Sequence, residues 1–355
     1  MPGHGTLEKH ALKHLQRLLE TKVNSRKTNS QAVELDHHGR TRRACLVYGA
    51  GLTLLPQAEA KTYPSGPVQL ILPFSAGSGS DLLSRVFAEG LTSALGQPVL
   101  VTNRAGAGGT IAAGAVAKAD PDGQTLAVIG MGHMANSALY KNLTYDTIND
   151  FAPIGPLGMF PNLLVVPAGS ATKSVRQLVD LAKAKPGKLN YVTAGVGSAA
   201  HINMQMLIAA TGIEALHVPM KGAGEIVTEI AAGRSDFAWV PVSAALGMVK
   251  TGRVVALAIS SKTRSKLVPD VPTIAEAGFP AAECNVWVGL LAPAKTPVNV
   301  ITTLSNHIRK LSESPALIAK LATAGAEPLS MTPQQFEALM RKDYVVLDRL
   351  MRKVN

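Results

Sequence analysis

Residues 68–95 read VQLILPFSAGSGSDLLSRVFAEGLTSAL, and this stretch indicates the fold. The run Val68–Leu72 is apolar and lies between two prolines, which is typical of a strand buried on both faces of a parallel sheet. A loop rich in glycine and serine follows, and Leu82–Leu95 then has the apolar spacing of a helix that ends at a glycine. Strand, tight loop and helix form the repeating unit of an α/β protein.

The same alternation continues along the chain. Short apolar runs predict further strands at Val99–Thr102, Thr125–Ile129, Leu163–Val166, Leu189–Thr193, Ala215–Val218, Phe237–Val242, Val254–Ile259 and Val286–Leu291. Helical patterns lie between them at Ala112–Ala119, Val175–Ala184, Ala199–Ala210 and Ile226–Ala232. Three Thr-Pro or Ser-Pro steps, at 296–297, 314–315 and 332–333, each predict a capped helix start. We therefore expect an α/β protein with mainly parallel sheets, and a length of 355 residues suits two domains.

The composition limits the classes of function that this protein can have. Hydrophobic residues make up 46% of the chain and charged residues 17%, so a sizeable core is expected. The net charge of +11 includes no run of five or six Lys or Arg, and aromatic residues are only 4%, so we expect no nucleic-acid partner. The two cysteines, Cys45 and Cys284, cannot form a zinc site by themselves.

The N-terminal 60 residues are typical of an extension followed by an export signal. Arg40, Arg42 and Arg43 precede the apolar stretch Ala44–Leu55, which is too short to span a bilayer. Ala58-Glu59-Ala60 then matches a signal-peptidase site, so the mature chain is expected to begin at Lys61. General secretion is favoured over the twin-arginine route. The polar residues 1–39 are explained best by an upstream start-site misassignment or by an artificially added extension. Cleavage would leave Cys284 without an intramolecular disulfide partner.

The first glycine-rich loop, Phe74-Ser75-Ala76-Gly77-Ser78-Gly79-Ser80, is a candidate anion site. Glycines let the backbone approach a ligand closely, and the N-terminus of the next helix offers unpaired N–H groups and a partial positive charge. The serines add hydroxyl donors. Asp81 is expected to cap the helix rather than contact the ligand. Taken alone, the segment fits a simple turn equally well.

The second loop, Thr193-Ala194-Gly195-Val196-Gly197-Ser198, again joins a strand to a helix. Gly195 to Ala200 imitates a dinucleotide-binding fingerprint, but Glu214, the acidic residue about 20 positions on, falls at the start of a strand rather than at its end. A second anion site, built from the N–H groups of Gly197 and Ser198, is the simpler interpretation. A dinucleotide-dependent enzyme that uses this loop remains the alternative. His201 is expected to be structural.

Other segments carry weaker signals. Asn103–Thr110 contains a third glycine-rich turn, which either lines the same cleft or is a tight connection. The sequence contains no nucleophile elbow, H-E-x-x-H or phosphate-loop motif, and Cys284 is expected to be inert. Donor-rich loops without a base and nucleophile favour binding over catalysis, so no catalytic residue, metal or cofactor is expected.

The chain also resembles a known family. Phe74, Gly77 and Asp81 are similar to the start of the mature Bug-type receptors, the periplasmic solute-binding proteins of tripartite tricarboxylate transporters. The likeness continues in order through Asn103–Gly109, Asp120–Gly123, Asp150–Pro153, Gly195–Ser198 with His201, His217–Pro219 and Asp270–Thr273. It covers essentially Tyr63 to the C-terminus.

The resemblance implies a type II periplasmic-binding-protein fold, with two lobes joined by two crossing strands near Pro161–Val166 and Cys284–Leu291. The lobes would be residues 61–162 with 285–355, and residues 163–284. A small carboxylate would be held between them and delivered to membrane transporter subunits from the periplasm. The ligand-binding residues that it implies are Phe74, Ser75, Ala76, Gly77, Ser78, Gly79, Ser80, His133, Thr193, Ala194, Gly195, Gly197 and Ser198.

Three departures from the family pattern bear on the ligand. Ala76-Gly77-Ser78 replaces Pro-Gly-Gly, Met220 replaces a tyrosine, and Val240-Pro241 replaces an Asp-Asn pair. These changes remove polar groups from the expected cleft. We therefore expect a ligand with an apolar or aromatic body and one carboxylate, rather than citrate.

Overall fold

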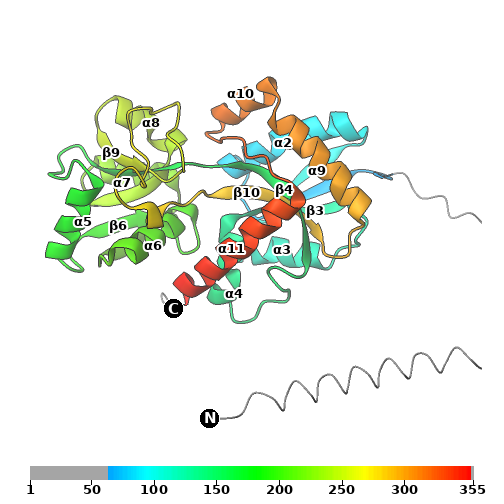
Figure 1. Ribbon diagram of the computed structural model, residues 1–355, viewed down its shortest axis with the longest axis horizontal. Coiled ribbons are helices and arrows are strands. Elements are labelled where there is room, and N and C mark those ends of the chain that lie inside the picture. Colours follow the sequence, from blue (N-terminus) through cyan, green and yellow to red (C-terminus); the bar gives the residue numbers. More distant parts are fainter. Residues whose placement is uncertain (1–62, 353–355) are drawn as a thin grey trace, which may run out of the picture. The chain divides into compact units, whose positions relative to one another are not determined.

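The structure is a computed structural model that describes residues 63–352, so the expected signal peptide and the start at Lys61 lie outside the described residues. Two five-stranded sheets form the framework (Figure 1). The first sheet has the order β2-β1-β3-β10-β4, and the second has the order β7-β6-β8-β5-β9. The strands of the first are β1 (Val68–Leu72), β2 (Val99–Asn103), β3 (Thr125–Gly130), β4 (Phe151–Met159) and β10 (Trp287–Pro293). Those of the second are β5 (Asn162–Pro167), β6 (Asn190–Thr193), β7 (Leu216–Pro219), β8 (Phe237–Pro241) and β9 (Val254–Ile259).

One strand in each sheet runs against its neighbours. Strand β10 is antiparallel to both β3 and β4, while β1 is parallel to β2 and β3. In the second sheet β5 is antiparallel to β8 and β9, while β6 is parallel to β7 and β8. These reversed strands are the first ones after each crossing: β5 follows β4 through Phe160-Pro161, and β10 follows the long connection from β9. The predicted α/β fold with two lobes and mainly parallel strands is confirmed.

Helices cover both faces of each sheet, and the burial of alternate strand residues shows why. Leu70 and Leu72 of β1 pack into one core with helices α2 (Gly79–Leu95), α9 (Val298–Ser312) and α10 (Pro315–Thr323). Ile71, on the opposite face, packs into a second core with α3 (Thr110–Ala117) and α11 (Pro333–Met351). Strand β5 divides in the same way between two cores formed with α5 (Val175–Ala184), α6 (Ala199–Thr211), α7 (Ala223–Ala231) and α8 (Val242–Lys250). The continuous apolar runs therefore fill both faces of each sheet.

Four short helical segments complete the described chain. They are η1 (Ala107–Gly109), η2 (Met131–Ala135), α4 (Asn136–Leu139) and η3 (Pro280–Ala282). Ile202 of α6, from the second lobe, is fully buried in the same core as Met131 of the first lobe. The two lobes therefore share apolar contacts beside the crossing segments.

Strand β4 and helix α8 were not expected. Pro153 and Pro156 argue against a strand, but β4 is an edge strand, and these residues face β10 next to the irregularities in its register. Helix α8 begins after Pro241 and has no side-chain cap, so it lacks the usual start signal. Helix α9 also differs, because Pro297 occupies the N-cap position that we expected Thr296 to take. Thr332 and Gln335 form the expected capping box of α11.

Candidate functional site

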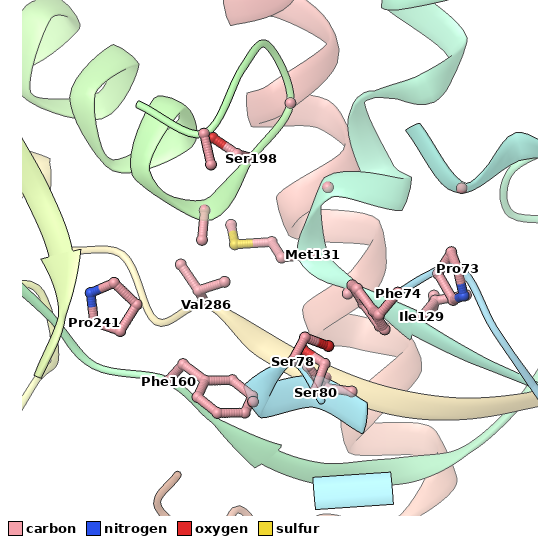
Figure 2. A pocket seen from close by; sticks show the side chains of 18 of the residues that line it. Pro73, Phe74, Ser78, Ser80, Ile129, Met131, Phe160, Ser198, Pro241 and Val286 are labelled. Carbon is pink, nitrogen blue, oxygen red and sulfur yellow. The ribbon is translucent and has the colours of Figure 1, made fainter. Parts of the chain in front are cut away.

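A cavity of about 590 Å³ is lined by residues of both lobes. The first lobe contributes the loops after β1, β2 and β3, and the second contributes the loops after β6, β7 and β8. In both sheets these loops follow the carboxyl ends of parallel strands, which is where ligands bind in open α/β sheets. The N-termini of α2, α6, α7 and α8 all reach the lining. Figure 2 shows Ser198 on one side of this cavity, and Ser78 and Ser80 on the other.

The first loop is held by a buried carboxylate. Asp81 is 2% exposed and accepts hydrogen bonds from Gly77 N (2.9 Å), Arg85 Nε (3.0 Å) and Asn103 Nδ2 (2.9 Å). Burial raises the pKa of Asp81, but these hydrogen bonds outweigh it and lower the pKa below its usual value. The cap of α2 is Ser78, whose Oγ accepts from Asp81 N at 3.3 Å. The expectation that Asp81 caps this helix is therefore wrong: its side chain fastens the preceding loop instead.

The second loop has the same design. Ser198 caps α6, and its Oγ accepts from His201 N at 3.3 Å. Thr193 is fully buried, and its Oγ1 lies 2.6 Å from His217 Nε2 and accepts from Gly195 N. His201 Nδ1 accepts from Gly197 N at 3.4 Å. The side chains behind the loop therefore fix its backbone, and Ser198 lines the cavity.

The two histidines behind this loop are neutral at pH 7. Burial, and then the neighbouring His217, lowers the pKa of His201 to about 4. Burial also lowers the pKa of His217. Their ring centroids are 5.1 Å apart. His201 is a structural residue, as the sequence predicts.

The segments after β2 and β3 close the first-lobe wall. Gly106–Gly109 lines the cavity, so the third glycine-rich turn does belong to the cleft. Ala107, at φ 45°, and three glycines in left-handed or extended positive-φ conformations make this turn. His133 also lines the cavity, but it is 5% exposed, and its Nε2 lies 3.1 Å from Thr147 O. Burial lowers the pKa of His133 to about 4.

The crossing segments form the floor between the lobes. The N–H of Phe160 donates to Val286 O at 2.9 Å, and both residues line the cavity. Asn162 is fully buried there and donates from Nδ2 to Asn203 Oδ1 at 2.6 Å, which ties β5 to helix α6. The first crossing, Phe160-Pro161, lies at the start of the expected range Pro161–Val166, most of which is strand β5.

The cavity contains no formal charge: of its lining residues in the described range 63–352, none is Asp, Glu, Lys or Arg. The polar groups at its surface are therefore neutral side chains, backbone groups and helix termini. Such an arrangement binds an anion through hydrogen bonds and partial charges rather than through an ion pair.

The structure brings most of the expected ligand residues together. The cavity is lined by Phe74, Ser78, Gly79, Ser80, His133, Ala194, Gly197 and Ser198. The other expected residues, Ser75, Ala76, Gly77, Thr193 and Gly195, are outside the lining. Thr193 and Gly77 are engaged in the hydrogen bonds that shape the two loops. Ligand contact by each residue stays a prediction.

Sequence reasoning missed one wall of the cavity. Phe160, Pro241, Ser243, Val286 and Ala324 line it, although they are far apart along the chain. None carries a motif; the crossing segments, the start of the unexpected helix α8 and the end of α10 bring them together. Of these five residues, Pro241 is the one that the sequence singled out, because Val240-Pro241 departs from the family pattern.

Features that would support other chemistries are weak. Glu214 precedes β7, whereas the Gly195 loop follows the neighbouring parallel strand β6, so the two are at opposite ends of the sheet. Cys284 is 4% exposed, and burial, followed by Asp343 and Glu283, raises its thiol pKa. Within residues 63–352, no cluster of three or more His, Cys, Asp or Glu could hold a metal ion. No helix in this range is both long and apolar enough to cross a bilayer.

Two α/β lobes, two crossing segments and a donor-lined cavity between them define the class of solute-binding receptors with a periplasmic-binding-protein fold. Residues 83–355 match the model of the TctC family, described as the tripartite tricarboxylate transporter family receptor. The chain belongs to this family.

Curated relatives support this assignment. The chain is 35% identical over 281 residues to protein BugT of Bordetella pertussis, covering 78% of this chain and 86% of that one. It is 33% identical over 317 residues to the UPF0065 protein in the tcbD-tcbE intergenic region of Pseudomonas sp. (strain P51), covering 89% and 94%.

Solved structures agree as well. A protein of R. palustris, solved with adipate, is 31% identical with a TM-score of 0.71, and the match covers 81% of this chain and 97% of that one. MatC from Rhodopseudomonas palustris, with bound malate, is 29% identical with a TM-score of 0.69, over 81% and 100%. The structure of periplasmic binding protein BugD gives 30% and 0.69, over 82% and 98%.

Proposed function

We propose that this protein is a periplasmic receptor that binds a small carboxylate between its lobes and delivers it to the membrane subunits of a tripartite tricarboxylate-type transporter. One observation carries the proposal. Helices α2 and α6, which pack against different sheets, both begin at the same uncharged cavity, and a serine caps the start of each helix. Membership of the receptor family supports it, and so do the adipate and malate found with two relatives.

The carboxylate is held by the N-terminal turns of α2 and α6, with Ser78, Ser80 and Ser198 as hydroxyl donors. Residues Phe74, Gly79, His133, Ala194 and Gly197 surround it, and Ser75, Ala76, Gly77, Thr193 and Gly195 shape the two loops. Charge-assisted hydrogen bonds of this kind contribute about 1.5–3 kcal/mol each. Closure of the lobes excludes water and strengthens them.

The lobes are residues 61–162 with 285–355, and residues 163–284. The division is supported by the strand order, because the two sheets share no strand. The receptor acts without a cofactor and carries out no reaction. The mature chain begins at Lys61 after export, which the N-terminal sequence of the secreted protein would test.

The function is tested by native mass spectrometry of freshly purified protein, followed by calorimetry with a panel of carboxylates and with NAD. A retained small acid and saturable binding of a carboxylate are expected. Tight binding of NAD together with turnover would instead establish the dinucleotide-dependent enzyme.

A further inference from the structure

The cavity has one polar part and one apolar part. Ser78, Ser80 and Ser198 mark the polar part, at the starts of α2 and α6. Pro241, Val286 and Phe160 lie together on another side of the cavity in Figure 2. The Phe160 ring also covers the start of α2, because a methyl group on Gly79 would lie 2.9 Å from its Cε1 atom. The apolar surface therefore begins directly beside the anion-binding turn.

At the start of α8 one N–H group is already engaged, and the start of α7 already carries a negative charge. The N–H of Val242, the first residue of α8, donates to Pro161 O at 3.1 Å, and Pro241 before it has no N–H. Glu225 lies in the first turn of α7, and its carboxylate accepts from Lys221 N at 2.7 Å. An anion near α7 would meet a helix start that already has a negative charge.

A second carboxylate on this side would thus meet no cation, although Ser243 at the start of α8 offers a hydroxyl group. The lining includes no Lys or Arg, and its one titratable side chain in residues 63–352 is His133. That ring is buried, already engaged with Thr147 O, and neutral at pH 7, because burial lowers its pKa to about 4. A carboxylate that loses its water against an apolar wall without a cation is strongly disfavoured.

The geometry points to a ligand with a single carboxylate and an apolar body of ring size. The carboxylate lies between the starts of α2 and α6, and the body contacts Phe160, Pro241 and Val286. The cavity volume of about 590 Å³ leaves ample room for a ring beside the carboxylate. This inference rests on the proposed function and adds the chemical class of the ligand.

The test compares ring monocarboxylates with acids that carry additional charges, using calorimetry on the full chain at pH 7. Benzoate, cyclohexanecarboxylate and 3-phenylpropanoate form one set, and adipate, malate and citrate form the other. The best ring acid is expected to bind at least tenfold more tightly than any acid of the second set. Tighter binding of adipate, malate or citrate would overturn the inference and leave the carboxylate receptor standing. Failure of all six to bind would count against the proposed function itself.

A charge placed on the apolar side provides the complementary test. Ala244 lines the cavity in the first turn of α8, so Ala244→Lys adds a cation there, and Ala244→Met is the uncharged control of similar length. Ala244→Lys should raise the affinity for adipate relative to the best ring acid at least fivefold, whereas Ala244→Met should not. Melting temperatures of both variants show that they fold. An unchanged ratio in folded Ala244→Lys would contradict the inference.

Discussion

The backbone N–H of Phe160 donates to the carbonyl oxygen of Val286 across 2.9 Å, which joins the two crossing segments at the cavity. These segments are the routes between the sheets within the described residues, so rotation of one lobe relative to the other must occur around them. This hydrogen bond holds the two routes side by side at the cavity. The joined segments are therefore the expected hinge, and they also line the cavity.

Hydrogen exchange should distinguish the hinge from the closing surfaces. We expect the Phe160 amide to be protected with and without ligand, because its hydrogen bond joins the two routes in both states. Peptides covering 130–136 and 193–201 should exchange more slowly once a carboxylate is bound, because they meet across the cleft. Mass spectrometry with and without the best-binding acid measures this. Equal slowing at Phe160 would place the hinge elsewhere.

Variants of Ser198 should separate its helix-capping role from ligand binding. Ser198→Ala removes the cap of α6 and should cost about 1 kcal/mol of stability. The same substitution removes a hydrogen-bond donor to the ligand. The binding free energy for the carboxylate should therefore weaken by about 1.5–3 kcal/mol, or roughly tenfold to 100-fold in affinity. Ser198→Asp keeps a good cap, but its charge repels a carboxylate, so it should remain stable and bind at least as poorly.

Ser198→Thr is the matched control, because its hydroxyl can both cap and donate. Combining Ser198→Ala with Ser78→Ala should weaken binding further. Calorimetric titration and thermal unfolding of the same samples provide both measurements. Unchanged affinity in the double variant would reject the assignment of this cavity as the carboxylate site.

Asp81 should matter more for stability than any exposed acidic residue. Its buried carboxylate accepts from Gly77, Arg85 and Asn103, so Asp81→Ala removes one acceptor from all three donors. We expect a loss of about 2–4 kcal/mol, together with weaker carboxylate binding as the first loop loosens. Glu337→Gln, in an exposed pair with Arg341, is the control and should cost less than about 0.5 kcal/mol. Similar losses in urea unfolding for both variants would contradict this role.

The sequence predicts the helices and strands whose apolar runs have clear ends. It fails where tertiary contacts override the local signals. The bounds of β1, α5 and β9 agree with the structure because their apolar runs have clear ends. Strand β4 was missed because Pro153 and Pro156 are tolerated only at an edge and next to register irregularities, which a sequence cannot reveal.

The residues of the candidate site also fall into a group that the sequence could predict and a group that it could not. Its two loops could be found because glycine and serine between a strand and a helix have a local chemical meaning. Phe160 and Val286 could not, because only the return of the chain to the first sheet makes them neighbours. The role of Asp81 was misassigned because sequence places it beside the helix start but does not show Asn103 across from it.

Stability should fall as the pH drops from 7 to about 4.5. His201 has a native pKa of about 4, whereas an unfolded histidine titrates near 6.5. Between these values the unfolded chain binds more protons than the native one, so acid favours unfolding by up to about 1.4 kcal/mol per pH unit for each such group. His133, with a pKa of about 4, contributes with the same sign. Carboxylates of lowered pKa, such as Asp81, lose their contribution only below this range.

His201→Gln should reduce this pH dependence, because glutamine does not titrate and its amide oxygen can accept from Gly197 N. Urea unfolding at several pH values between 4.5 and 7 gives the slope for the parent chain and the variant. We expect the slope to fall by up to one proton. An identical slope would show that His201 is protonated in the native state as readily as in the unfolded state.

Gly132 should control closure of the cleft. It lies in η2 of the first lobe, and a methyl group added there would be 2.7 Å from the carbonyl oxygen of Gly197 in the second lobe. Gly132→Ala should therefore force the lobes apart and cost about 1–2 kcal/mol of ligand affinity, while the ligand-free melting temperature changes little. Gly247→Ala is the control, because its added methyl meets no atom within 4 Å in the interior of α8. That variant should stabilise the chain by about 0.5–1 kcal/mol and leave binding unchanged. If Gly132→Ala instead lowers the melting temperature and leaves affinity intact, the contact belongs to the folded core and has no part in closure.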